Sequence, residues 1–237
     1  MNYQIDAPGS AIRTTVKLPA SKSISNRALI LNALSYSAYD VENLSDCDDT
    51  NLMVKALNSN DRDFNVGAAG TTMRFLTAFL SKVVGEWTIT GTERMKNRPI
   101  KVLVDALNAL GARIEYMEKE GYPPLRIFGS ALQGGEISLP GNVSSQYISA
   151  ILMIAPLTEN GVTLHLEGAI ISRPYIHITL QLMEQYGVRA SWTENTIKVL
   201  PQEYKPIRFT VESDWSAASY WYEIMACLLY TSPSPRD

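Results

Sequence analysis

The sequence predicts an α/β (α+β) fold made of repeated units in which strands alternate with helices. One observation is a recurring order of short apolar strand, glycine- or serine-rich turn and amphipathic helix, with helix starts near Ser23, Gly70 and Ser145. A second observation is a shared pattern at 98–113 and 173–189: Arg-Pro, an amphipathic helix, a glycine, a small apolar residue and an arginine. These matches indicate an internal repeat.

Length and composition are those of an ordinary globular protein of one large or two small domains, with 237 residues and 46% hydrophobic residues. The net charge of −3 argues against general nucleic-acid binding, so an anion site would have to be a local cluster of cations. The longest apolar run, 150–157, is too short to span a membrane, and no signal core opens the chain. Two cysteines without metal or disulfide spacing fit a reducing compartment, so we expect a cytoplasmic protein.

The first repeated unit predicts an anion pocket at a helix start. Val16 and Leu18 indicate a short strand, and an amphipathic helix follows. Ser23 and Arg27 are four residues apart, so they share one helix face, with Lys22 at the entrance. Free N–H groups and partial positive charge at a helix N-terminus favour anions. For this stretch alone, a capped helix with two solvated cations is the favoured interpretation.

The second unit repeats this design with glycine in place of serine. Gly70 allows close backbone approach to a ligand, and Arg74 lies four residues later. Arg74 could contact a ligand or serve as a structural ion-pair or carbonyl-binding residue. Arg94, Lys96 and Arg98 alternate, so in extended backbone their side chains would point to one side.

Candidate metal ligands are few. The acidic run at 46–49 precedes a helix and could bind a divalent cation, but helix capping is the expected role because no second ligand set follows. His165 alternates with apolar residues in a predicted strand and should face solvent, and His177 has no ligand partner on its helix. We therefore expect no metal site.

Seven segments in order together resemble the 5-enolpyruvylshikimate-3-phosphate synthase (3-phosphoshikimate 1-carboxyvinyltransferase) family. They are PASKSISNRALILNAL, GAAGTTMRFLTAFL, TGTERMKNRPI, YPPLR, GNVSSQYISAILMIAP, ISRPYIHITLQLM and VESDWSAASY. The resemblance runs from about residue 7 to 226. It implies two similar domains, each of three βαβαββ units, of which the chain holds the first domain, with the second truncated.

The resemblance also divides the chain. Residues 1–13 would be a lead-in and a candidate part of the second domain, 14–210 the N-terminal enolpyruvyl-transferase domain, and 211–227 the start of the second domain. The last ten residues, LLYTSPSPRD at 228–237, break the pattern, and we expect them to be a non-native tail.

By resemblance, the function is transfer of the enolpyruvyl group of phosphoenolpyruvate to the 5-hydroxyl of shikimate 3-phosphate in chorismate and aromatic amino-acid biosynthesis. Phosphate leaves through a tetrahedral intermediate, no metal or organic cofactor takes part, and the full-length protein is expected to be a monomer. The positions matching shikimate 3-phosphate contacts are Lys22, Ser23, Arg27, Ser144, Ser145, Gln146, Ser172 and Tyr175. Those matching phosphoenolpyruvate contacts are Lys22, Gly70, Arg98 and Gln146. Ala68 departs from the family, where asparagine is common.

The substrates together carry about five to six negative charges. The cations offered here are Lys22, Arg27 and Arg98, with Arg74 as a further candidate, and they cannot balance that charge. We therefore expect the main acid and base groups and further cations in the second domain, and a chain that binds shikimate 3-phosphate without turnover.

Three different functions compete with this one. The first is that of the related transferases acting on UDP-N-acetylglucosamine, in which asparagine follows the lysine and a cysteine lies in the loop matching 92–98. Here Ser23 follows Lys22, and the loop has no cysteine. The second is a non-catalytic module that binds a phosphate ligand, and the third is an unstable fragment without function.

Overall fold

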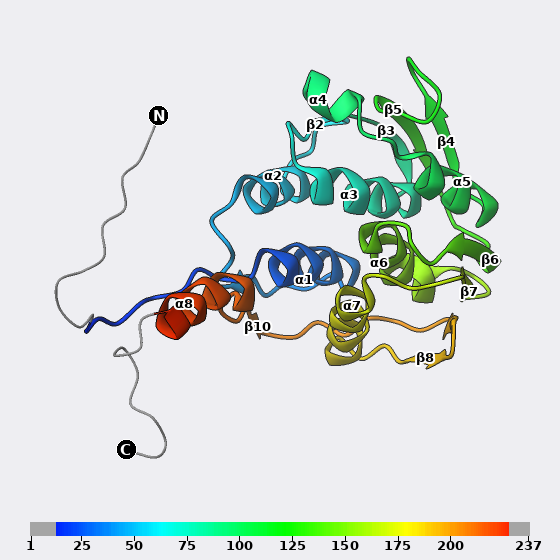
Figure 1. The fold of residues 1–237 in the computed structure, drawn as a ribbon. Helices are drawn as coiled ribbons and strands as arrows, with labels where there is room; N and C mark the ends of the chain where they lie inside the picture. Colours follow the sequence, from blue (N-terminus) through cyan, green and yellow to red (C-terminus); the bar gives the residue numbers. More distant parts are fainter. Residues whose placement is uncertain (1–12, 228–237) are drawn as a thin grey trace.

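The computed structural model describes residues 13–227, and it contains two four-stranded sheets with the same strand order (Figure 1). The first sheet has the order β2-β3-β5-β4 and the second the order β6-β7-β9-β8. In each sheet the first two strands are parallel and the others antiparallel. The strands are β2 (Asp63–Asn65), β3 (Gly85–Thr90), β4 (Arg113–Tyr116), β5 (Leu125–Gly129), β6 (Gly135–Pro140), β7 (Val162–Glu167), β8 (Ala190–Thr193) and β9 (Thr196–Val199).

Helices connect these strands in the order expected for βαβαββ units. The helices are α1 (Lys22–Leu34), α2 (Asp48–Leu57), α3 (Gly70–Lys82), α4 (Glu93–Lys96), α5 (Lys101–Ala109), α6 (Ser145–Ile154), α7 (Arg173–Gln185) and α8 (Trp215–Cys227), and α6 continues into a 3₁₀ turn, Ala155–Leu157. The unit at 63–129 and the unit at 135–199 are therefore complete, which confirms the predicted α/β class and its repeat.

The core lies between the sheets and around α3 and α6. These two helices contact each other and are buried on almost every side, as expected for helices without a broad polar face. One continuous apolar cluster includes residues of both complete units. The units are thus parts of one folded body, which positions their helix starts relative to one another.

The unit nearest the N-terminus differs from the prediction. No strand forms at Val16 and Leu18, and only Ala20 makes an isolated bridge, with Ser213. Val16 and Leu18 instead line an apolar groove against α8. A strand needs a neighbouring strand for its hydrogen bonds, and β10 (Phe209–Thr210) pairs with β1 (Val41–Glu42) instead.

The segment with alternating cations is also not extended as predicted. Residues 93–96 form the single helical turn α4, because the N–H groups of Met95 and Lys96 both donate to the carbonyl of Thr92. Met95 is buried beneath this turn, so Arg94 and Lys96 do not lie on one side of an extended chain. Arg98 follows the turn, and its side chain approaches Gly70.

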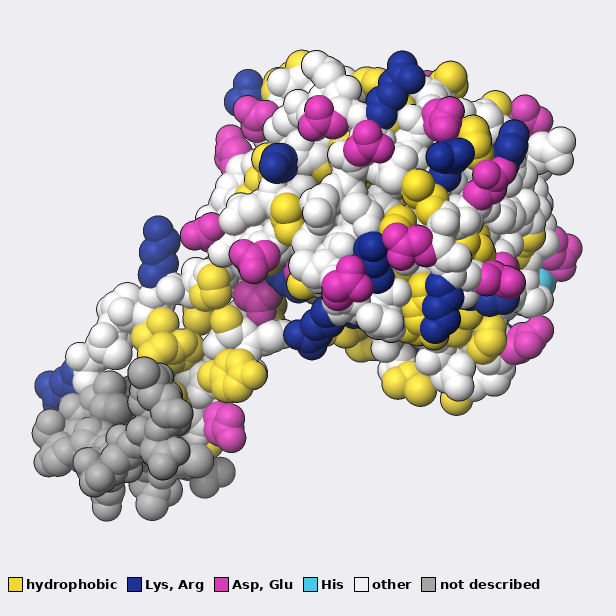
Figure 2. Space-filling view, turned by 90° about the horizontal axis from the view of Figure 1, so that it is seen from above, with side chains coloured by type: hydrophobic (Ala, Val, Ile, Leu, Met, Phe, Trp, Pro, Cys, Tyr) yellow, Lys and Arg dark blue, Asp and Glu magenta, His cyan; other side chains and the backbone are white. Residues whose placement is uncertain are grey.

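Helix α8 confirms the predicted fourth helix start, and the carboxylate of Asp214 accepts a hydrogen bond from the Ala217 N–H at its first turn. The helix lies away from both four-stranded sheets (Figure 1). Apolar side chains gather on the extension that carries it (Figure 2), and Trp215, Tyr220 and Tyr222 are strongly exposed. The predicted lead-in at 1–13, apart from residue 13, and the predicted tail at 228–237 lie outside the described residues.

None of the helices in the described part of the chain is long and apolar enough to cross a membrane.

The core location of α6 leads to a test of packing. Ile151 is completely buried in α6, whereas Ile171 is 72% exposed. We expect Ile151→Ala to lower the free energy of unfolding by about 2–5 kcal/mol, because it leaves a cavity. The matched substitution Ile171→Ala should change it by less than about 0.5 kcal/mol. Urea unfolding followed by circular dichroism measures both, and equal effects would contradict the assignment of α6 to the core.

Buried tyrosines should make the stability of the fold depend on pH. Burial raises the pKa of Tyr116 and of Tyr186 to about 12. The unfolded chain loses these protons near pH 10, while the folded chain keeps them, so stability should fall as the pH rises from about 10 to about 12. The Tyr186 hydroxyl has no hydrogen-bond partner within the described residues, so Tyr186→Phe should cost little at pH 7 and make this fall shallower.

Urea unfolding at several pH values between about 8 and about 11 measures this slope, which depends on the difference in bound protons between the two states. Tyr36→Phe is the control, since Tyr36 is 95% exposed. A slope that Tyr186→Phe leaves unchanged would show that this tyrosine does not carry the effect.

Candidate functional site

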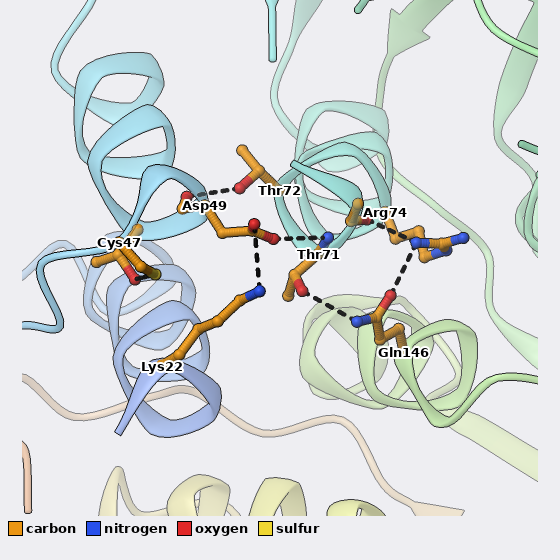
Figure 3. A network of polar contacts seen from close by, with 9 residues as sticks. Lys22, Cys47, Asp49, Thr71, Thr72, Arg74 and Gln146 are labelled. Atoms are coloured by element: carbon orange, nitrogen blue, oxygen red, sulfur yellow. Dashed lines mark hydrogen bonds and ion pairs between the residues drawn. The ribbon is translucent and has the colours of Figure 1, made fainter. Parts of the chain in front are cut away.

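The starts of α1, α3 and α6 come together, and polar side chains link them (Figure 3). The Gln146 amide, on α6, donates to the Thr71 hydroxyl of α3 at 3.0 Å. The Lys22 ammonium, on α1, lies 3.2 Å from the Asp49 carboxylate, which accepts the Thr71 N–H at 3.2 Å. Three helix N-termini therefore direct N–H groups and partial positive charge to one region.

Gly70 is the point at which two arginines meet. A Cβ atom added to Gly70 would clash with Nη1 of Arg98 and lie 2.7 Å from Nη1 of Arg74. A side chain here would push both guanidinium groups aside, so the two arginines use the space left by the absence of a Cβ at Gly70. The sequence predicts a close approach at Gly70, and the structure identifies its partners as two cations.

Neither arginine has a carboxylate within ion-pair distance among residues 13–227, although the charge of Asp49 acts on Arg98. Arg74 and Arg98 form no ion pair there, and the buried Nε of Arg74 has no hydrogen-bond partner among the same residues. Burial, followed by the charges of Arg74 and Arg94, lowers the pKa of Arg98. Two adjacent cations outside any ion pair repel each other in the ligand-free chain, and an anion would relieve their repulsion.

Arg74 also determines the orientation of the Gln146 amide. Its Nη1 donates to Oε1 of Gln146 at 2.8 Å and to the carbonyl of Gly70 at 2.9 Å. Arginine can only donate, so the amide oxygen must face Arg74 and the amide nitrogen must face Thr71. The carbonyl-binding role considered for Arg74 is therefore present, together with a position beside Arg98.

Arg27 is buried in the protein interior. Its guanidinium donates to the Thr179 hydroxyl at 2.7 Å, the Ser23 carbonyl at 2.9 Å and the Ser149 hydroxyl at 3.0 Å. A longer bond reaches the Tyr175 carbonyl at 3.5 Å. Burial lowers its pKa to about 10, so it remains charged at neutral pH. Four of its five N–H groups thus serve protein atoms, which leaves one for a ligand.

The predicted serine positions differ in their surroundings. The hydroxyls of Ser23, Ser145 and Ser172 form no hydrogen bond within the part of the chain that the structure describes. Ser144 caps α6 by accepting the Gln146 N–H at 3.3 Å. Ser172 and Tyr175 begin α7 beside Arg27, and Tyr175 is 44% exposed. These contacts define two groups: Gln146 and Arg98 lie beside Gly70 and Arg74, and the carbonyls of Ser23 and Tyr175 lie beside Arg27.

Sequence reasoning missed the role of Asp49 and of Thr71. The sequence predicts that the acidic run caps α2, but Asp49 contacts Lys22 and the start of α3. No spacing between positions 22, 49 and 71 could reveal this contact, because it depends on how three helices pack. No group of three or more His, Cys, Asp or Glu side chains among the described residues is arranged to hold a metal ion.

Comparison with known proteins gives concordant findings. The sequence model of the family described as EPSP synthase (3-phosphoshikimate 1-carboxyvinyltransferase) matches residues 7–60 and 57–229. A 3-phosphoshikimate 1-carboxyvinyltransferase of Bacteroides fragilis is 61% identical over 227 residues, covering 95% of this chain and 55% of that protein. A 3-phosphoshikimate 1-carboxyvinyltransferase of Vibrio campbellii is 43% identical over 243 residues, covering 90% of this chain and 57% of that protein. The chain thus spans about half the length of the curated relatives it matches.

Among solved structures, an EPSP synthase from Acinetobacter baumannii aligns with a TM-score of 0.79 at 21% identity. The alignment covers 89% of this chain and 53% of that chain. At this identity the likeness concerns the fold.

The contrast between Arg27 and Arg98 gives a matched test. Arg27→Met should lower the free energy of unfolding by about 2 kcal/mol or more, because charge-assisted hydrogen bonds joining α1 to α6 and α7 are lost. Arg98→Met should change it by less than about 0.5 kcal/mol, since Arg98 forms no ion pair within the described residues and lies beside Arg74. Urea unfolding measures both variants. A large loss on removing Arg98 would indicate a structural role for that side chain.

Proposed function

Because the chain belongs to the EPSP synthase (3-phosphoshikimate 1-carboxyvinyltransferase) family, we propose that it forms one half of the substrate site for enolpyruvyl transfer from phosphoenolpyruvate to shikimate 3-phosphate. The observation that carries this proposal is the pair Arg74 and Arg98, which meet over Gly70 and form no ion pair within the described residues. A protein retains such a like-charge pair where a ligand anion neutralises it.

Phosphoenolpyruvate is assigned to the group around Gly70. Lys22 and Arg98 supply charge, the N-terminus of α3 supplies N–H groups, and Gln146 presents an amide nitrogen whose orientation Arg74 determines. The N-cap residue of α3, Ala69, offers no side-chain cap, so these N–H groups remain for a ligand, apart from that of Thr71.

Shikimate 3-phosphate is assigned to the neighbouring group around Arg27. The hydroxyls of Ser23, Ser145 and Ser172 can donate to phosphate or ring oxygens, and Ser144 and Gln146 lie at the start of the same helix as Ser145. Tyr175, which is 44% exposed, is assigned to the same pocket. Arg27 contributes mainly by holding the starts of α1 and α7 in place, with one N–H left for the ligand.

In the proposed reaction the 5-hydroxyl loses its proton and its oxygen bonds to C2 of phosphoenolpyruvate, while the C2–C3 double bond opens and the methylene carbon C3 gains a proton. The tetrahedral intermediate then loses a proton from the methyl carbon and releases phosphate, so the enol ether forms. The residues of this chain bind and orient the two anions and concentrate positive charge around them. The main acid and base groups are assigned to a second domain.

We also propose 14–210 as the first domain and 211–227 as the start of another. The exposed aromatic side chains of α8 support the boundary near 211. In this arrangement the chain alone binds ligands without turnover. We also propose that the full-length protein is cytoplasmic and monomeric.

Titration calorimetry with the purified chain tests binding. We expect heat of binding with shikimate 3-phosphate and, more weakly, with phosphoenolpyruvate, and none with UDP-N-acetylglucosamine. The sugar nucleotide binding in preference to shikimate 3-phosphate would favour the related transferase, and no binding of any of the three would refute the proposal. Phosphate released on mixing both substrates with the chain would contradict the assignment of catalysis to a second domain.

Arg98→Met tests the anion site itself. Loss of a charge-assisted contact of about 1.5–3 kcal/mol should weaken phosphoenolpyruvate binding by about tenfold or more. Arg113→Met is the matched control, since Arg113 pairs with Glu115 on the outer strand β4. Equal binding by the wild type and Arg98→Met would remove Arg98 from the site.

A further inference from the structure

Asp49 is an acidic side chain at the centre of the cationic site. One carboxylate oxygen lies 3.2 Å from the Lys22 ammonium, and the other accepts the Thr71 N–H at 3.2 Å (Figure 3). Its side chain is only 16% exposed. Within the described residues, no other carboxylate forms an ion pair with Lys22, Arg74 or Arg98.

The contacts of Asp49 are those that a ligand anion would make. A carboxylate or phosphate at a helix N-terminus accepts backbone N–H bonds and pairs with a nearby cation. Asp49 does both at the start of α3, so its own carboxylate occupies part of the anion position.

Asp49 is held firmly, whereas Lys22 can move. Asp49 lies in the first turn of α2, and its backbone carbonyl accepts the Thr72 hydroxyl at 2.7 Å, which fastens it to α3. The Lys22 side chain is 46% exposed, and a lysine stem is long and flexible. An incoming anion would therefore draw Lys22 away from Asp49 rather than displace Asp49.

We propose that Asp49 is the internal counter-ion of the site and imposes a common electrostatic cost on each anion that binds there. A ligand must compete with Asp49 for Lys22 and approach a fixed negative charge. Ligands that also reach Arg74 and Arg98 recover this cost, whereas a single small anion does not. This inference rests on the proposed function, because it concerns the same phosphoenolpyruvate position.

The test compares Asp49→Asn with Asp48→Asn in the full chain. Both variants remove one negative charge from the first turn of α2, but Asp48 is exposed and forms no ion pair within the described residues. In Asp49→Asn the side-chain amide oxygen can still accept the Thr71 N–H, so the fold should persist. Titration calorimetry at constant ionic strength measures the dissociation constants of phosphoenolpyruvate and of inorganic phosphate.

We expect Asp49→Asn to tighten binding of both anions about three- to fivefold, the size of one half-exposed ion pair. Asp48→Asn should change either constant less than about twofold. In a Lys22→Gln background, Asp49→Asn should tighten binding less than in the wild-type background, because the competition for Lys22 is absent and only the repulsion by the fixed carboxylate is relieved.

Wild-type binding with no tightening in Asp49→Asn, or equal tightening in Asp48→Asn, overturns the counter-ion proposal and leaves the proposed function intact. No binding of phosphoenolpyruvate by the wild type or any variant overturns both. Binding that appears only in Asp49→Asn supports Asp49 as the counter-ion.

Discussion

The buried guanidinium of Arg27 is the interaction on which the arrangement of the helices depends. It extends from α1 to the Ser149 hydroxyl on α6 and the Thr179 hydroxyl on α7, and it lies 5.4 Å from the Phe75 ring on α3. One side chain thus links four helices at the centre of the molecule. A buried charge is costly unless its donors are used, and here protein oxygens accept most of them. The position of Arg27 therefore fixes where the helix starts meet.

The helix starts in turn create a region with more positive than negative charge. Arg74 and Arg98 approach each other over a glycine, and among the described residues Asp49 is the carboxylate that opposes the cations from nearby. Folding places these groups together despite their repulsion, since packing of α3 against α6 supplies the compensating free energy. The cations of the site therefore repel one another, and a bound anion would reduce this repulsion.

The two groups of predicted site residues differ in how directly they can act. Gly70, Gln146 and Arg98 lie where a ligand could contact them, and Arg74 orients the Gln146 amide. Arg27, predicted as a ligand contact, gives most of its donors to the protein. An arginine in a motif can thus support a site by holding the surrounding helices in place. Only the contacts of the folded chain distinguish this structural role from direct ligand binding.

Local patterns along the chain were enough to predict the class of fold, the repeat and most of the helices, whereas the site residues were predicted from the resemblance of seven segments to a family. These features depend on periodicity, on capping residues and on motifs that lie within one helix turn of each other. Packing between distant segments was needed to show that Val16 and Leu18 face α8, that α4 is helical around buried Met95, and that Asp49 pairs with Lys22.

Each of these contacts depends on which distant segment is available as a partner. Arg27 and Thr179 are 152 positions apart in the chain, and they meet only because α1 packs beside α7. The Lys22–Asp49 pair likewise forms only because the starts of α1 and α2 lie together. Local sequence patterns do not predict such contacts, because the contacts depend on how whole helices pack against one another.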